Sequence, residues 1–329
     1  MAAVAAILRS LARAVRRDLG TFRSIQVNNF FLFVFLLIYG ALVSGVRPSS
    51  SYPFLVMLGF LLLFPLSSDP LARIPASRLG LWPLRRSQRW ALRAVSLVLS
   101  PVLWFALAIV WKVQASLTIA VLAVVLVGQA LPPAKGNFFL RAPKILPDFQ
   151  RNHLRQMLSV LDTWLAILIS LGGTAFRIFA GHPDPAAFPI FAMLVALAMS
   201  TYTQCLFALD GRSGLTRYHL LPMPGWRILW SKDTAWLALL CLLVAPLSLP
   251  SGLAFGLTAL AIGHYPSTQL RLPLVRGRFA GGRFLFGAAQ MVLGAMLGFG
   301  AAGQSLIYLP IAAGLYAASL YLCRNMRKL

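Results

Sequence analysis

The sequence predicts an all-α polytopic membrane protein with about ten transmembrane helices and with both termini in the cytoplasm. First, hydrophobic residues make up 59% of the 329 residues and charged residues only 11%, a composition that soluble folds do not show. Second, apolar segments alternate with loops that are either strongly basic or nearly free of charge. The positive-inside rule then places all but three of the 30 Lys and Arg in the cytoplasm. The three exceptions are Arg47, Lys112 and Arg177.

Residues 1–24 predict an amphipathic helix that lies in the headgroup plane of the bilayer. Its apolar stripe comprises Leu8, Leu11, Val15, Leu19 and Phe22. The arginines that fall roughly opposite are Arg9, Arg13, Arg16, Arg17 and Arg23. We expect the apolar face to enter the lipid and the guanidinium groups to meet phosphates. The alternative is a basic N-terminus without a fixed structure.

The apolar runs that follow have the length that a bilayer requires, about 17–25 residues per helix. The predicted spans are 28–46, 51–68, 94–111, 115–133, 158–179, 186–209, 235–249, 252–270, 284–301 and 304–323. Their outer links are short, so the helices pair as tight hairpins. The region 235–265 is ambiguous, because Pro246 and Pro250 interrupt one apolar stretch. A single helix there would place the arginines of 271–283 outside, so we expect two short or re-entrant segments.

A weak internal repeat divides the chain. A shift of 139 positions lays the loop after the second span over the loop after the sixth. The positions that match are Arg78 with Arg217, Leu81 with Leu220, Pro83 with Pro222 and Arg93 with Lys232. Each half then contains an interfacial helix and four spans, and the repeat is parallel. The predicted domains are the interfacial helix 1–24, a first membrane repeat 25–137, a second repeat 138–283 and an extra helix pair 284–329.

One loop resembles a known family. The stretch FALDGRSGLTRYHLLPMPGWRILWSKD (207–233) resembles the coupling segment in permease subunits of type-2 ATP-binding-cassette (ABC) exporters. The resemblance rests on four features in order along the chain: an Asp, a Gly, a Leu–x–Pro turn, and an Ile-Leu-x-x-Lys sequence at the start of the next span. In that family the segment sits in a groove of a separate ATPase subunit. The resemblance therefore implies such a partner, with coupling candidates Arg78, Pro83, Arg93, Asp210, Gly214, Arg217, Leu221, Pro222 and Lys232.

The sequence departs from that family in three ways. It has about ten predicted spans where the common permease has six. Its first loop, 69–93, keeps the proline and the arginines but little else of the pattern. All seven acidic residues are Asp, so salt bridges to an ATPase would use cations of this chain and acids of the partner.

A few polar residues fall inside the predicted spans, where they are costly and often functional. Asp162 is interpreted as an interfacial ion-pair partner, for example of Arg155. His264 is interpreted as a structural hydrogen-bonding group rather than a proton switch. Gln129, Gln204 and Gln290 are expected to tie helices together. The GxxxG at 294–298 forms either a homodimer face or an intramolecular contact.

The sequence argues against most enzymes. Metal-dependent lipid or polyprenyl enzymes need clustered carboxylates, so seven scattered Asp make a membrane enzyme of this kind the less favoured alternative. No GxxxxGK[ST] motif occurs. We therefore predict no catalytic residues, metal or cofactor in this chain. The basic blocks flank apolar runs, which indicates lipid contact rather than nucleic-acid binding. A non-transporting scaffold or assembly factor remains the main alternative. The excess of Arg over Lys and the abundant Ala favour a bacterial cytoplasmic membrane as its location.

Overall fold

The computed structural model is mostly helical and divides into two compact units. One unit comprises residues 1–27 and 31–135, and the other comprises residues 28–30 and 136–329. This boundary lies within a few residues of the predicted start of the second repeat at 138. The structure describes residues 2–20, 26–30, 32–34, 36, 82, 85–99, 104, 107, 111, 119, 148–179, 182, 184–210, 225–270, 272, 274, 276, 279–303 and 307–323.

In the first unit the described elements are helix α1 (Ala2–Gly20), the two-residue strand β1 (Gln26–Val27) and helix α5 (Arg86–Val98). Ile7 and Leu11 of α1 are buried together with Leu92 of α5. The exposed side of α1 carries Arg9, Arg13 and Arg16. The amphipathic helix is therefore present. Leu11 of the predicted apolar stripe packs on α5, and contact of the stripe with lipid stays a prediction.

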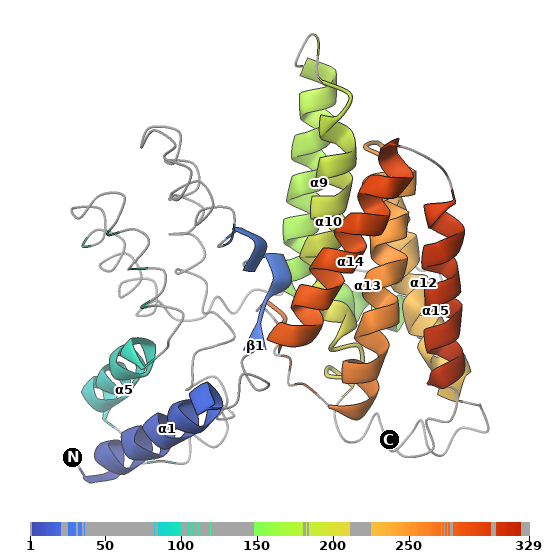
Figure 1. The fold of residues 1–329 in the computed structure, drawn as a ribbon. Helices are drawn as coiled ribbons and strands as arrows, with labels where there is room; N and C mark the ends of the chain where they lie inside the picture. Colours follow the sequence, from blue (N-terminus) through green and yellow to red (C-terminus); the bar gives the residue numbers. More distant parts are fainter. Residues whose placement is uncertain are drawn as a thin grey trace. The chain divides into compact units, whose positions relative to one another are not determined.

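The second unit is a helical bundle arranged around α13 (Figure 1). Its elements are α8 (Asp148–Leu158), α9 (Leu161–Phe179), α10 (Ala187–Thr203), α12 (Gly225–Val244), α13 (Leu249–Gln269), β2 (Gly282–Arg283), α14 (Phe284–Gly303) and α15 (Tyr308–Leu322). Helix α13 packs against α10, α12, α14 and α15, and α10 packs against α9. A helix that touches four others has little surface left for lipid, which explains why α13 is buried along most of its length.

The ambiguous region 235–265 forms two helices. Residues 245–248 separate α12 from α13, with Pro246 in the turn and Pro250 in the first turn of α13. Proline suits the first helical turn, where its missing N–H has no intrahelical acceptor. Arg177, at the end of α9, donates a 2.6 Å hydrogen bond to the Pro246 carbonyl and fastens the turn. The structure thus has two helices here and not one, with 20 residues in α12 and 21 in α13, and how far each enters a membrane stays a prediction.

The helix after each predicted coupling loop begins earlier than the predicted span. Helix α5 begins at Arg86 rather than near 94, and α12 begins at Gly225 rather than near 235. The positions 86 and 225 differ by 139, which is the shift of the predicted repeat. The two loops are thus followed by helices in equivalent register. Each helix begins with basic and aromatic residues, Arg86 to Trp90 in α5 and Trp226 with Arg227 in α12. Each then continues into its apolar segment.

The GxxxG of α14 packs inside the bundle. A Cβ on Gly294 would lie 3.0 Å from the ring of Phe255 in α13, and one on Gly298 would lie 2.6 Å from the Met193 sulfur in α10. Small residues let helix backbones approach closely, and here the approach is to neighbours in the same chain. Of the two interpretations, the structure therefore favours intramolecular packing over a homodimer face at this motif.

Among the described helices, α9 and α14 are long and apolar enough to cross a membrane, and α10 and α15 are shorter apolar helices. The ten-span topology and its orientation stay predictions. The first four predicted spans lie largely outside the described residues.

Candidate functional site

The two ends of the predicted coupling segment meet in a buried ion pair. The Lys232 ammonium in α12 lies 2.7 Å from Oδ2 of Asp210, in the turns after α10, and both side chains are 3% exposed. Lys232 also donates to the Leu206 carbonyl at 2.8 Å and lies 4.8 Å from the ring centroid of Phe207. Removing either charge would leave the other buried without its partner. The pair therefore fixes where the chain leaves α10 and where it enters α12.

The surface helix α8 supports the same ion pair. Gln156 of α8 donates a 2.7 Å hydrogen bond to Oδ1 of Asp210, so both carboxylate oxygens have partners. His153, one turn earlier, lies 3.5 Å from Gln156 through Nδ1. Helix α8 continues almost directly into α9, and Thr163 of α9 bonds back to the Met157 carbonyl at 2.9 Å. The predicted second interfacial helix is thus joined to the ends of the predicted coupling segment.

Protonation of His153 at acidic pH should lower the stability of the contacts that α8 makes with Asp210 and Lys232. Burial, together with the charge of Lys232, lowers the pKa of His153 from 6.5 to about 4. Between pH 6.5 and pH 4, His153 is protonated in the unfolded chain but neutral in the folded protein. The free energy of unfolding therefore decreases as the pH falls from about 6.5 to about 4. A pKa difference of this size corresponds to at most about 3 kcal/mol.

Thermal unfolding followed at pH 7, 5.5 and 4.5 measures this effect. We expect His153→Gln to show a smaller loss of stability over this range than the parent protein. His182 is exposed, so His182→Gln should keep the full pH dependence. An unchanged pH dependence in His153→Gln would contradict the role of this residue.

Most of the other coupling candidates lie outside the described residues, namely Arg78, Pro83, Gly214, Arg217, Leu221 and Pro222. The same applies to Gln129 among the predicted intramembrane groups. Arg93 belongs to α5. The structure thus brings together two of the predicted coupling residues, Asp210 and Lys232.

Asp162, at the start of α9, is a hydrogen-bonded anchor. Its Oδ1 accepts from the Asn28 side chain at 2.8 Å, and its Oδ2 accepts from the Ala280 backbone N–H at 2.7 Å. Arg155, the partner that the sequence suggested, is exposed on α8. This corrects the ion-pair interpretation of Asp162. The carboxylate instead holds residue 28 and the segment before β2 against α9 through uncharged donors.

Gln204 and Gln290 tie helices together, as predicted. Oε1 of Gln290 in α14 accepts from Asn29 at 2.7 Å and from Gln204 at 2.8 Å. The amide nitrogen of Gln290 donates to Thr203 at 2.8 Å and to the Ala259 carbonyl at 2.7 Å. All four side chains are buried. This polar layer connects α10, α13, α14 and residue 29, and its groups are bonded to one another, which is how a core of this kind specifies one packing.

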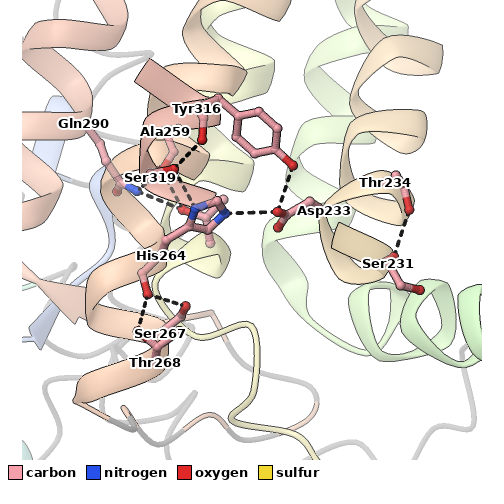
Figure 2. Close-up of polar contacts among 11 residues, drawn as sticks. Ser231, Asp233, Thr234, Ala259, His264, Ser267, Thr268, Gln290, Tyr316 and Ser319 are labelled. Atoms are coloured by element: carbon pink, nitrogen blue, oxygen red, sulfur yellow. Dashed lines mark hydrogen bonds and ion pairs between the residues drawn. The ribbon is translucent and has the colours of Figure 1, made fainter. Parts of the chain in front are cut away.

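His264 in α13 has an acidic partner that sequence reasoning missed. Its Nε2 lies 3.0 Å from Oδ2 of Asp233 in α12, and its Nδ1 lies 2.8 Å from the Ser319 hydroxyl in α15 (Figure 2). The Tyr316 hydroxyl donates to the same Asp233 oxygen at 2.9 Å. Asp233 and His264 are both 0% exposed. His264 therefore makes the hydrogen bonds that were predicted for it, and one of them is to a carboxylate.

The sequence around the residues that were not predicted, Asp233, Tyr316 and Ser319, gives little indication of their role. Asp233 follows Lys232 directly and looks like half of an interfacial charge pair, and Ser319 and Tyr316 lie in an apolar run. The useful signal is the helical angle: adjacent residues differ by about 100°, so Lys232 and Asp233 must face different neighbours. Among the described residues, no group of three or more His, Cys, Asp or Glu could hold a metal ion.

Comparisons with protein families, with curated proteins and with solved structures find no match to this chain.

Proposed function

We propose that this chain is the membrane-spanning permease subunit of an ABC exporter in a bacterial cytoplasmic membrane, coupled through its cytoplasmic loops to a separate ATPase subunit. The observation that carries the proposal is the coupling-segment pattern of 207–233 together with the buried Asp210–Lys232 pair at its two ends. The membrane setting and the coupling role rest on different observations.

Membrane embedding is supported by the surface of the bundle, which is apolar outside and polar inside. On α14 the buried positions include Gly287, Gln290, Gly294 and Gly298. The large side chains of the same helix that are exposed are Leu285, Val292, Leu293, Met296 and Phe299. Helix α9 repeats this arrangement, with Asp162, Thr163 and Ser170 buried and Leu168, Leu171 and Phe179 exposed. A soluble protein rarely exposes apolar patches of this extent, whereas lipid solvates them.

A coupling role is supported by the buried contacts that join Asp210 to Lys232. A segment that transmits the movement of a partner to a helix must be held to that helix by fixed contacts. Without them, the segment would move and the helix would stay in place. The ion pair fastens the end of α10 to the first turns of α12, and Gln156 adds the surface helix α8. Movement of the segment 211–224 would therefore reach three helices at once.

Purification of the tagged protein in mild detergent, followed by identification of bound chains and an ATPase assay, tests the proposal. We expect an ATPase subunit to copurify. Pro222→Ala and Arg217→Ala should lower stimulated ATPase activity at least several-fold with unchanged membrane abundance. Arg276→Ala is the matched control, because Arg276 is an exposed arginine outside the segment. Unchanged stimulation in both variants would refute the coupling role, and a stable complex without an ATPase would favour the scaffold.

A further inference from the structure

Three helices meet at one buried hydrogen-bonded cluster that the proposed coupling role does not use. Figure 2 shows the His264 ring of α13 between Asp233 of α12 and Ser319 of α15, with the Tyr316 hydroxyl directed at the same carboxylate. The cluster consists of four side chains from three helices, α12, α13 and α15. The partners of each ring nitrogen of His264 indicate which nitrogen carries a hydrogen.

The hydroxyl of Ser319 is already committed. It donates to the Tyr316 carbonyl of its own helix at 2.7 Å, so towards His264 it can only accept. Nδ1, the first of the two ring nitrogens of His264, therefore carries a hydrogen.

The second ring nitrogen faces an oxygen that already accepts a hydrogen bond. Oδ2 of Asp233 receives the Tyr316 hydroxyl at 2.9 Å and faces Nε2 of His264 at 3.0 Å. The contact between Oδ2 and Nε2 needs one hydrogen between the two atoms, and beside the ionised form of Asp233 that hydrogen is carried by Nε2. With hydrogens on both nitrogens, this arrangement corresponds to the cationic form of the ring.

The charges around the pair agree with this count. Lys232, the neighbouring cation on α12, already contacts Asp210 at 2.7 Å. Among the described residues, the other titratable groups that interact with Asp233 are Tyr316 of α15 and Cys323 directly after that helix, both neutral in their ordinary forms. A buried carboxylate without a cation costs several kcal/mol, and the imidazolium offsets that cost. With one proton on the pair, the four charges of Asp210, Lys232, Asp233 and His264 sum to zero.

One oxygen of Asp233 differs from the rest of the cluster. Within the described part of the chain, its Oδ1 has no hydrogen-bond partner, although the residue is fully buried. Asp162, which serves as an anchor, has both oxygens bonded. An open oxygen on a buried carboxylate is unusual and needs an explanation. This oxygen is available to a proton or a water molecule, whereas neither oxygen of Asp162 is.

We propose that Asp233 and His264 form a proton-binding site that links α12 to α13 and α15 while the proton is bound. On release, one N–H bond of the imidazolium breaks, the proton passes to water, and a neutral ring remains beside the carboxylate. The ionic part of the link is then lost. Because Asp233 directly follows Lys232, the change in charge occurs beside the Asp210–Lys232 pair. The site does not depend on the exporter proposal and would exist in a scaffold as well.

Nitrogen-15 NMR of histidine-labelled protein in lipid nanodiscs tests the site directly. The His264 signals are assigned by their disappearance in His264→Gln. At pH 6.5 we expect two N–H groups on His264 in the parent protein. In Asp233→Asn one of them should be lost, because a buried imidazole without a carboxylate favours the neutral form. Tyr316→Phe is the matched control: it removes a donor to the same oxygen and should keep both N–H groups.

Raising the pH stepwise tests whether the proton exchanges. We expect one of the two N–H signals to be lost before the protein unfolds, as judged by size-exclusion chromatography and thermal unfolding. A single N–H in the parent protein at pH 6.5 would overturn the proposal, as would two N–H groups in folded Asp233→Asn. Two N–H groups that persist to the point of unfolding would show a permanent ion pair and overturn the exchange. None of these results requires an ATPase partner, so failure here is distinct from failure of the exporter proposal.

Discussion

Lys232→Met should lower the free energy of unfolding by about 3–5 kcal/mol, because it leaves the Asp210 carboxylate buried without its cation. Methionine has nearly the length of the lysine stem, so the buried volume stays filled, while the ammonium contact with the Phe207 ring is lost. The hydrogen bond to the Leu206 carbonyl is lost as well. Denaturant unfolding in mixed micelles, followed by the fluorescence of the eight tryptophans, measures the difference.

Two further variants separate the ion pair from simple loss of packing. Asp210→Asn in the Lys232→Met background removes the unpaired charge and should recover much of the lost stability. Arg227→Met is the matched control, since Arg227 is exposed in the first turn of the same helix and should change stability by less than about 0.5 kcal/mol. A cost below about 1 kcal/mol for Lys232→Met would show that this pair is not buried as described.

The parts of the fold that follow from local pattern could be predicted, and those that need a distant partner could not. Apolar length located α9, α10, α14 and α15, and Pro246 with Pro250 located the break between α12 and α13. The start of α12 was placed ten residues late, because Trp226, Arg227 and Lys232 look like an interfacial loop. In the structure Ile228 and Leu229 are buried, and their packing extends the helix back to Gly225.

The candidate site divides in the same way. Asp210 and Lys232 were recognised from a pattern 23 residues long, and they contact each other. Asp162, His264, Gln204 and Gln290 were singled out as polar residues in apolar runs, and all four make buried hydrogen bonds. Their partners could not be deduced: Asn28 lies 134 positions from Asp162, and Asp233 lies 31 positions from His264. Only packing of the helices brings these groups together.

Gly287→Ala should destabilise the protein although alanine is the better helix former. A Cβ at Gly287 would collide with the side-chain oxygen of Asn29. Asn29 cannot easily move away, because its amide nitrogen donates to Ser200 at 2.8 Å and to Gln290 at 2.7 Å. Its backbone N–H is also held, by Thr201 at 2.8 Å. The collision is therefore relieved only by breaking part of the buried polar layer.

The expected cost combines two terms. Overpacking a fitted core costs about 1–3 kcal/mol, and a buried polar group that loses its partner costs about 1–3 kcal/mol more. The gain in helix propensity is only about 0.5–1 kcal/mol, so we expect a net loss of about 2–4 kcal/mol in denaturant unfolding. Gly314→Ala is the matched control: this glycine of α15 has open space around it, and the variant should gain stability.

A second-site change shows whether the collision is with Asn29. Asn29→Ala in the Gly287→Ala background removes the atom that the new methyl group meets, so the double variant should be more stable than the sum of the two single changes predicts. The non-additivity should exceed about 0.5 kcal/mol, as it does for residues in contact. If Gly287→Ala instead gains stability as Gly314→Ala does, residue 29 does not lie against α14. The anchoring of residues 28–30 in the helical bundle would then have to be abandoned.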